Sequence, residues 1–261
     1  STGVIQTTGG GPSATGIPGD IGIIKLSADG TTRMYATYLG GAGMEQPQSM
    51  IADAAGNLIV TGRTNSGSSF PGNLAGAGGN YDIFVTKMNA DGTAIIGSTR
   101  IGGSNDDGVN ISSNRGAGPQ TLLRNYGDDA RSEVILDANN NILLAGSTNS
   151  SNFPVSNGFQ NTFGGSQDAV IIKLNPDANT ITWSTYLGGI GFDAAFGIAV
   201  NAGNGIIYIA GGTTTSVLFP GIDQSALQQS YGGSTDGFIT RLHDNGSNVS
   251  MFNSTYLGTS G

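Results

Sequence analysis

Charged side chains are scarce in this chain, at 11% of residues, and they concentrate between Ser104 and Glu133. This segment holds five carboxylates and three of the ten Lys and Arg residues, namely Asp106, Asp107, Asp128, Asp129, Glu133, Arg115, Arg124 and Arg131. Neighbouring carboxylates supply the oxygen ligands that Ca²⁺ takes, so Asp106, Asp107, Asp128 and Asp129 are candidate calcium ligands. Arg115, Arg124, Arg131, Asp128 and Asp129 are the candidates for contact with a protein or a glycan. The alternative is a solvated insertion without a ligand.

Three further carboxylates occupy equivalent places, each four residues after the second glycine of a Gly-Gly pair: Glu45, Asp107 and Asp193. Carboxylates on equivalent loops could bind calcium together with nearby carbonyl oxygens. Each copy usually shows a single carboxylate, whereas a calcium site needs several. The pattern therefore favours an acidic cap that accepts hydrogen bonds from the local backbone.

The stretch from Asp137 to Asn141 has the opening spacing of a calcium loop, but it lacks the glycine and the final glutamate that such a loop requires. Its counterparts at Asp53 and Asn201 indicate a recurring turn instead. No cofactor is predicted, and calcium remains the one metal with any candidate ligands.

Enzyme chemistry finds little support in the sequence. His243 is the only histidine and there is no cysteine, so neither a His-based zinc site nor a cysteine nucleophile can be built. No phosphate-binding GxxxxGK motif is present. A glycosidase needs only two carboxylates, which leaves a carbohydrate-active protein as the alternative to a non-enzymatic one. Trp183, the only tryptophan, is interpreted as packing within the fold, with a sugar-stacking platform as the alternative.

These residues lie on a chain that repeats itself, which is the sequence signature of a repeat architecture. Each copy begins with an Asp, followed five residues later by a cation, a turn, and a strand that ends in Leu-Gly or Ile-Gly. The Asp residues are Asp20, Asp82, Asp168 and Asp236, and the cations are Lys25, Lys87, Lys173 and Arg241. The turns between the two strands predict β-hairpins.

The second half of each copy also repeats, as a turn at Asp53, Asp137 or Asn201, an apolar run that closes on glycine, and a Phe-Pro pair. Each full copy thus offers four short strands, which is typical of a propeller blade. We therefore predict an all-β fold, a β-propeller of four-stranded blades within a single region, 1–261. The units are about 20–81, 82–167, 168–235 and a partial 236–261, with 1–19 as the end of a preceding unit.

Composition agrees with this prediction and limits the function. The 45 glycines predict many tight turns, and the absence of cysteine leaves stability to core burial. A net charge of −8 argues against nucleic acid or anionic lipid as a partner, because both require clustered Lys and Arg. The sequence contains no apolar stretch long enough to predict membrane insertion.

The repeats resemble a known family. The string from Asp168 to Asn175, the Ser-Thr-Tyr-Leu-Gly-Gly run from Ser184 to Gly189, the Asp/Asn-Ala-x-Gly/Asn turn and the Phe-Pro pair look like the bacterial β-propeller repeat called the SBBP repeat. The resemblance runs from about Val4 to the end of the chain. It implies a secreted or surface-exposed bacterial protein in which propellers adjoin adhesion-type domains, and it implies no catalytic residues.

Two departures from the pattern are informative. Copy two has Arg100 where the others have Tyr38, Tyr186 and Tyr256, and it carries the insertion described above. The chain also begins and ends inside a unit, which gives about three and a half blades, fewer than the four of the smallest typical propeller. We expect a fragment of a longer polypeptide that self-associates in isolation; the alternative is a four-bladed ring closed by the N-terminal segment or by a partner.

Two functions follow as hypotheses. The first is a non-enzymatic module at the bacterial cell surface or outside the cell, a scaffold or interaction domain whose partners are other domains of its polypeptide, other surface proteins or glycans. The second is a carbohydrate-active propeller that binds or cleaves glycans through carboxylates on its rim. In both, the insertion is the place to look for binding.

Overall fold

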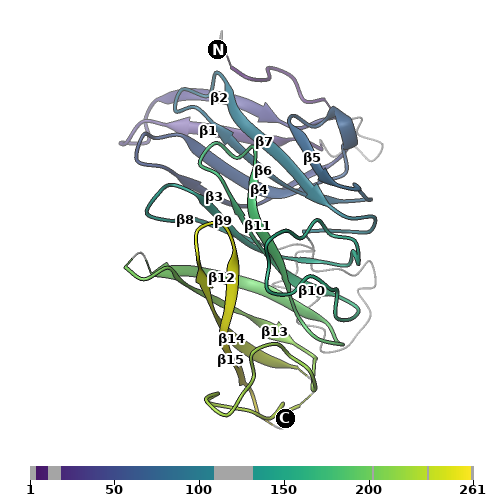
Figure 1. Ribbon diagram of the computed structural model, residues 1–261. Coiled ribbons are helices and arrows are strands. Elements are labelled where there is room, and N and C mark those ends of the chain that lie inside the picture. Colours follow the sequence, from purple (N-terminus) through teal and green to yellow (C-terminus); the bar gives the residue numbers. More distant parts are fainter. Residues whose placement is uncertain (1–3, 11–18, 109–131, 202, 234, 260–261) are drawn as a thin grey trace.

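The computed structural model describes residues 4–10, 19–108, 132–201, 203–233 and 235–259 of the chain. Within them the chain forms fifteen β-strands and a single turn of 3₁₀ helix, which confirms the all-β prediction (Figure 1). The described part of the chain contains no helix of the length and apolar character that crossing a membrane would demand.

The strands form four sheets. The first sheet pairs β1 (Ile21–Leu26) with β2 (Arg33–Leu39). The second has the order β3 (Glu45–Ala52), β4 (Leu58–Thr64), β6 (Asp82–Met88), β7 (Ile95–Gly102) and β5 (Asn73–Gly76), and the 3₁₀ turn η1 (Gly67–Ser69) precedes β5. The third has the order β8 (Glu133–Leu136), β9 (Ile142–Thr148), β10 (Asp168–Leu174) and β11 (Ile181–Leu187). The fourth has the order β12 (Asp193–Asn201), β13 (Ile206–Thr213), β14 (Asp236–Asp244) and β15 (Val249–Leu257).

The predicted hairpins are present in all four sheets, and the turns of the first three share one geometry, whereas the longer turn of the fourth closes through the Asn245 N–H and the Asn248 carbonyl. In the first sheet Ser27 and Thr32 close the loop, and the Gly30 N–H donates to the Ser27 carbonyl at 2.8 Å. Gly30 has a φ of +72°, a left-handed conformation that favours glycine. The third sheet places Ala178 at the equivalent position with a φ of +56°. A turn built on a left-handed residue therefore joins the two strands even where glycine is replaced.

The sheets do not coincide with the sequence units. Each sheet of four or more strands takes its first two strands from the second half of one copy and its hairpin from the next copy. In the second sheet, for example, Thr64 at the end of β4 pairs with Asp82 at the start of β6. The hairpin from Asp236 to Leu257 accordingly completes the fourth sheet, and the two-stranded sheet is the first one, at the N-terminal end. The expected boundaries near 82, 168 and 236 thus fall inside sheets, because the strands pair across them.

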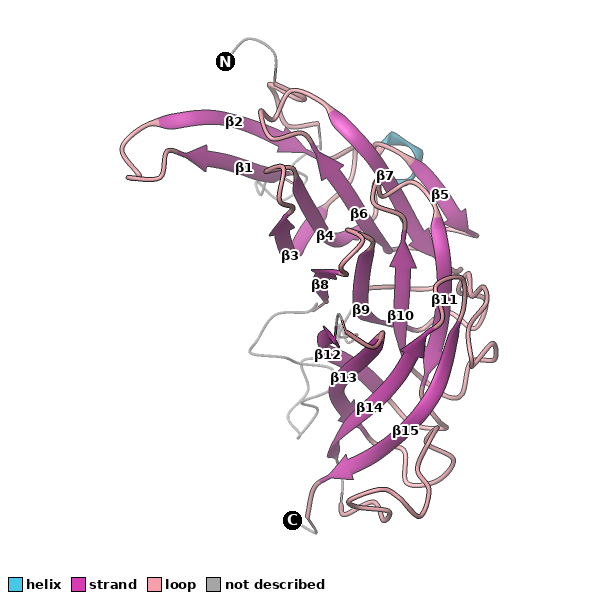
Figure 2. Ribbon diagram, turned by 60° about the vertical axis from the view of Figure 1, so that its left-hand side comes forward, coloured by secondary structure: helices cyan, strands magenta, loops and turns pink. Residues whose placement is uncertain are grey.

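The four sheets follow one another along an arc (Figure 2). Strands β3, β8 and β12 lie on its concave side, and β7, β11 and β15 lie on its convex side. Three apolar clusters fill the spaces between successive sheets. One is centred on Leu39 and Phe84, the next on Ile101 and Val170, and the last on Leu187 and Phe238. Each of the two middle sheets is therefore buried on both faces, as its apolar strands predict.

Candidate functional site

The carboxylates that follow the Gly-Gly pairs lie buried where the chain crosses from one sheet to the next. Asp193, at the start of β12, is fully buried. It accepts hydrogen bonds from the Gly189 N–H at 2.8 Å, from the Thr215 hydroxyl at 2.9 Å and from the Thr213 hydroxyl. Its oxygens therefore hold the corner and the end of β13 together.

The same arrangement recurs at the other two corners. Asp107 accepts hydrogen bonds from the Gly103 N–H at 2.7 Å, from the Ser150 hydroxyl at 3.1 Å and from the Thr148 hydroxyl. Glu45 accepts them from the Gly41 N–H at 3.2 Å, the Thr64 hydroxyl at 2.6 Å and the Ser66 hydroxyl. The favoured interpretation, an acidic cap on a turn, describes all three. The hydroxyl partners form a repeated Thr-x-Ser/Thr motif, which sequence reasoning missed although its regular spacing is a usable signal.

A second carboxylate faces each of these corners. Asp168 is fully buried, and one of its oxygens accepts from the Gly164 N–H at 2.8 Å while the other, Oδ1, has no hydrogen-bond partner. A β-carbon on Gly188 would lie 2.6 Å from Asp168 Oδ1 and 2.8 Å from Asp193 Oδ2. The glycine of the Leu-Gly motif is thus required because two carboxylates close on it.

Burial and mutual repulsion perturb this pair. Burial first, and the charge of Asp193 in addition, raise the pKa of Asp168 to about 7, although the hydrogen bond from the Gly164 N–H opposes the shift. Burial also raises the pKa of Asp193, against its three hydrogen bonds. Two buried carboxylates so close to each other favour a state in which one carries a proton.

In the second copy, a cation offsets the repulsion between the two buried carboxylates of the corner. Arg100 replaces the tyrosine of the other copies, and its Nη1 lies 3.3 Å from Asp82 Oδ2 in a buried ion pair. The partner carboxylate, Asp107, still has its pKa raised to about 7, by burial first and by the charge of Asp82 in addition. Arg100 is therefore not a random exchange, because it neutralises the carboxylate that its own sheet buries.

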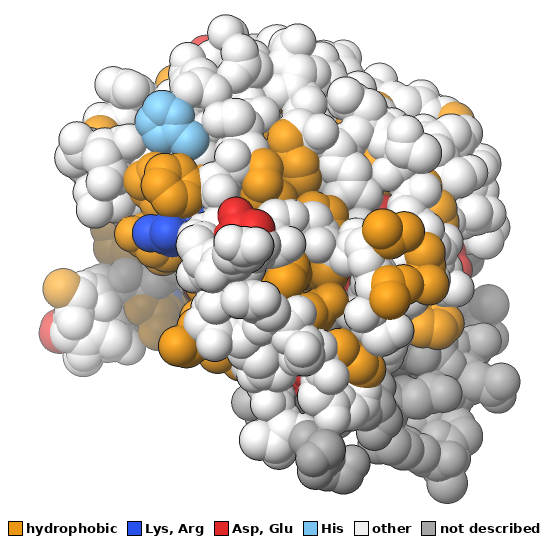
Figure 3. Space-filling view, turned by 60° about the horizontal axis from the view of Figure 1, so that its bottom comes forward, with side chains coloured by type: hydrophobic (Ala, Val, Ile, Leu, Met, Phe, Trp, Pro, Cys, Tyr) orange, Lys and Arg blue, Asp and Glu red, His pale blue; other side chains and the backbone are white. Residues whose placement is uncertain are grey.

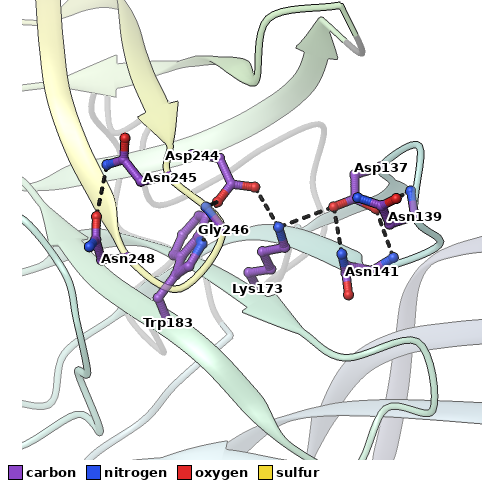
Figure 4. Close-up of polar contacts among 9 residues, drawn as sticks. All are labelled: Asp137, Asn139, Asn141, Lys173, Trp183, Asp244, Asn245, Gly246 and Asn248. Atoms are coloured by element: carbon purple, nitrogen blue, oxygen red, sulfur yellow. Dashed lines mark hydrogen bonds and ion pairs between the residues drawn. The ribbon is translucent and has the colours of Figure 1, made fainter.

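A second repeated cluster joins neighbouring sheets at the hairpin turns (Figure 4). Lys173 Nζ lies 3.1 Å from Asp137 Oδ2 in its own sheet and 2.5 Å from Asp244 Oδ2 in the next one. Trp183 donates its ring N–H to the other oxygen of Asp244 at 3.0 Å. Burial lowers the pKa of Lys173, but its hydrogen bonds and ion pairs with Asp244 and Asp137 outweigh this and raise it. Lys173 is therefore held in its protonated form between the two carboxylates.

Earlier copies carry the same cation with fewer carboxylate partners. Lys87 pairs with Asp53 at 2.9 Å and donates to the Pro176 carbonyl, on the turn of the next sheet, at 3.0 Å. Lys25 donates to the Ala90 carbonyl, at the equivalent turn position, at 2.7 Å. In each case the cation that the sequence repeats reaches forward to the following sheet.

The calcium-like turn at Asp137 has its carboxylate already in use. Its Oδ1 accepts from the backbone N–H groups of Asn139 and Asn141, and its Oδ2 accepts from the Asn141 side chain and pairs with Lys173. These contacts hold the pKa of Asp137 below its usual value despite burial. Within the described residues, no three His, Asp or Glu side chains gather as metal ligands.

Neither of the two aromatic candidates for chemistry presents a site. Trp183 is fully buried between sheets, so its ring is not a platform for a sugar. His243 lies at the start of a hairpin turn, where its Nδ1 is 2.7 Å from Asn245 Oδ1. This contact fits a turn residue better than a general base, which needs a substrate-facing position.

The insertion is described only at its two ends. Arg115, Arg124, Asp128, Asp129 and Arg131 lie outside the described residues. Of the remaining candidates, Asp107 is the buried corner carboxylate, and the backbone carbonyl of Asp106 accepts from Asn149 N–H at 3.0 Å. Glu133 Oε2 accepts from the Ile198 N–H at 2.6 Å and thereby links β8 to β12 of the next sheet. The carboxylates of Asp107 and Glu133, and the backbone of Asp106, thus support the frame.

The point of insertion can be located by comparing pairings. Asp107 is equivalent to Asp193, because it bridges Thr148 as Asp193 pairs with Thr213. Glu133 is equivalent to Gly197, because it pairs with Ala145 as Gly197 pairs with Ala210. Three residues separate Asp193 from Gly197, whereas 25 separate Asp107 from Glu133, so 22 are extra.

The extra residues lie where the equivalent strands of the other sheets have a β-bulge. The register of β12 shifts between Ala195 and Gly197, and that of β3 shifts between Pro47 and Ser49 at the equivalent place. The extra residues therefore enter the innermost strand at its β-bulge, a feature that often occurs beside functional sites.

Comparisons of the sequence with protein-family models and with curated proteins found no match.

Asp168, with one oxygen that lacks a hydrogen-bond partner, predicts an unusual pH dependence of stability. Because the folded-state pKa of Asp168 is raised from 3.8 to about 7, its contribution is full below pH 4 and is lost as the pH rises towards 7. Asp168→Asn keeps an oxygen for Gly164 and places an amide beside Asp193. We expect it to stabilise the protein by about 1–3 kcal/mol at pH 8 and to flatten the slope between pH 5 and 8, measured by urea unfolding.

Asp82→Asn is the matched control for this prediction, since it breaks the ion pair with Arg100 and leaves a buried cation. It should destabilise the protein at every pH in the series. If Asp168→Asn destabilised the protein at pH 8 as Asp82→Asn does, the carboxylate pair would not be the source of strain that we describe.

The cation clusters predict a graded loss of stability. Lys173→Met leaves Asp137 and Asp244 without their cation in a buried setting, and should cost about 3–5 kcal/mol. Lys25→Met removes a hydrogen bond to the Ala90 carbonyl and a distant contact of the ammonium with the Tyr35 ring, but no ion pair, and should cost about 1 kcal/mol. Equal losses for the two variants in urea unfolding would show that the ion pairs add nothing to the hydrogen bond.

Proposed function

We propose that the sheets are the blades of a β-propeller. Three successive sheets share one order, in which the first strand lies on the concave side of the arc and the hairpin of the next copy lies outside it. The first sheet supplies the hairpin of a further blade. This regular stacking around a common concave side supports the propeller that the SBBP-like repeats imply.

We propose further that the chain is a non-enzymatic extracellular module of a bacterial surface or secreted protein, in which the propeller is a scaffold for an interaction loop. One observation carries this proposal. The repeated charged groups, such as Asp193 and Lys173, are occupied by contacts within the frame, whereas the insertion at 109–131 interrupts the innermost strand at its bulge. A frame that is complete without the insertion leaves it for binding.

The composition of the insertion suits a polar partner. It brings Arg115, Arg124 and Arg131 together in sequence with Asp128 and Asp129, in a chain with only 11% charged residues. A protein surface or a glycan fits this mixture of charges, while the net charge of −8 disfavours nucleic acid. The buried corner carboxylates Asp107 and Asp193 lack the exposure that a glycosidase would need.

Excising the insertion tests whether it is separate from the frame. Replacing residues 109–131 by one alanine gives the second copy the spacing of β12, so Asp107 and Glu133 should keep their contacts. We expect the variant to fold with a melting temperature within a few degrees of the parent chain, because no pairing of the described strands is removed. The measurement is thermal unfolding followed by circular dichroism.

Binding is then compared between the parent chain and the excised variant on a glycan array, with and without calcium, alongside a panel of chromogenic glycosides. A ligand of the parent should be lost on excision and on mutation of Arg124, Asp128 or Asp129 to alanine, and neither protein should hydrolyse a glycoside. Unfolding of the excised variant, equal binding by both proteins, or glycoside hydrolysis would each contradict the proposal.

A further inference from the structure

The outer face of the fourth sheet is apolar and uncovered. Tyr208, Ile239 and Leu257 are 38%, 37% and 42% exposed, and Phe252 beside them is 55% exposed. Seen from the C-terminal end, apolar side chains gather here near the histidine and a cation (Figure 3). A shallow hollow on this face is lined by residues that include Tyr208, Arg241 and Phe252. We call this surface the forward face of the fourth sheet.

The same positions are buried in the sheets that have a successor. Leu143, Ile171 and Leu187 are the equivalents in the third sheet, since Leu143 pairs with Lys173 as Tyr208 pairs with Arg241. All three are fully buried in the cluster shared with the fourth sheet. In the second sheet Ile59, Val85 and Ile101 are likewise fully buried against the third. The forward face is thus built to be covered by another sheet of this repeat.

The first sheet shows the complementary surface. Ile24, Leu26 and Tyr38 are exposed, and they form what we call its backward face. Their equivalents in the third sheet, Ile172, Leu174 and Tyr186, are buried against the second sheet. In the fourth sheet Leu242 and Tyr256 are buried against the third in the same way. One end of the arc therefore exposes the surface that the other end lacks.

Polar groups at the two ends match as well. In the interior, Lys25 donates to the Ala90 carbonyl and Lys87 to the Pro176 carbonyl on the next turn. Arg241 holds this cation position in the fourth sheet, where its guanidinium lies 4.5 Å from the ring centre of Phe252 and its Nε donates to Asn253 Oδ1 at 2.8 Å, which leaves its terminal nitrogens for the turn of another sheet. The turn of the first sheet offers Ala28 at the equivalent carbonyl position, next to the exposed Asp29.

An open space marks the same junction. Where two sheets meet, Gly92 of one turn packs against the ring of Tyr35, and a β-carbon there would lie 2.6 Å from it. Gly30, the equivalent glycine of the first sheet, has nothing within 4 Å of its β-carbon position. Asn253 occupies the position of Tyr35 in the fourth sheet and is half-buried.

We propose that a second copy of this chain docks head to tail, with the forward face of its fourth sheet on the backward face of the first sheet. A second copy supplies both complementary surfaces at once, and Arg241 of one copy then reaches the turn at Ala28 of the other. Because the contact joins two different surfaces, it closes into a ring if the rotation allows. The curvature of the arc in Figure 2 favours a ring of two copies. The contact rests on the stacking of the sheets and is independent of any binding by the insertion.

Disulfide trapping tests the register of this contact, and the chain has no cysteine of its own. In the interior, a β-carbon on Gly97 would lie 3.4 Å from that of Asn179 but only 1.9 Å from the Asp177 carbonyl oxygen, so the facing turn must shift outward wherever this position carries a side chain, as it does in the fourth sheet. The equivalent residues at the two ends are Asn253 and Thr31. A mixture of Asn253→Cys and Thr31→Cys proteins should form a cross-linked dimer under oxidation, because β-carbons at this separation are close to disulfide geometry.

Each cysteine variant alone, and Thr31→Cys mixed with the exposed Ser68→Cys, should stay uncross-linked. Cross-linking of Asn253→Cys with itself, at the rate of the mixture, would indicate a contact between two identical faces and would overturn the proposal.

The mass in solution gives an independent readout. Sedimentation equilibrium at about 50 μM should give twice the mass of the chain, with the fraction of dimer rising with concentration. Ile239→Glu and Leu257→Glu should weaken the dimer at least tenfold while the chain stays folded by circular dichroism. Leu227→Glu, at an exposed leucine outside both faces, is the control and should leave the dimer unchanged. A monomer at this concentration, or a dimer insensitive to Ile239→Glu, would overturn the proposal.

Discussion

Every sheet of this protein is apolar on both faces, and this constraint governs the rest of the structure. A strand such as β10, in which Val170 and Ile172 face one neighbour while Ala169 and Ile171 face the other, is stable only between two sheets. Successive sheets must therefore stack, and the chain must pass from the second strand of one sheet's hairpin to the innermost strand of the next sheet. The corners, the cation clusters and the exposed faces at the two ends all follow from this requirement.

Stacking buries polar backbone groups at the corners, where the chain crosses from one sheet to the next. The backbone that crosses between sheets leaves N–H groups such as that of Gly189 without strand partners, and a buried carboxylate accepts their hydrogen bonds. Asp168, at the start of β10 in the preceding sheet, brings a second carboxylate to the adjacent glycine, Gly188. A device that satisfies the backbone thus creates repulsion between buried charges. A shared proton or, in the second copy, Arg100 relieves it.

Much of this could be predicted from the sequence. The regular Asp, cation, turn and Leu-Gly positions predicted the hairpins, and their repetition in every copy predicted structural rather than catalytic roles. The sequence could not predict which strands of successive copies share a sheet, because a repeated pattern does not show where one structural unit begins. The pairing of Thr64 with Asp82, for example, joins two different copies. The partners of the corner acids were missed for the same reason. Ser150 lies 43 residues from Asp107, and only the closing of the sheet brings them together.

The need to keep the contacts between stacked sheets also explains where the insertion lies. A long segment added to an outer hairpin turn would disturb the contacts that Lys87 or Lys173 makes with the following sheet. A segment added at the bulge of the innermost strand disturbs less, because the ladder there is already interrupted, as it is between Ala195 and Gly197. Both ends of the insertion are then fixed, since Asp107 holds the corner on one side and Glu133 bridges to Ile198 on the other. The frame can therefore carry a long additional segment without losing any of the contacts that stack its sheets.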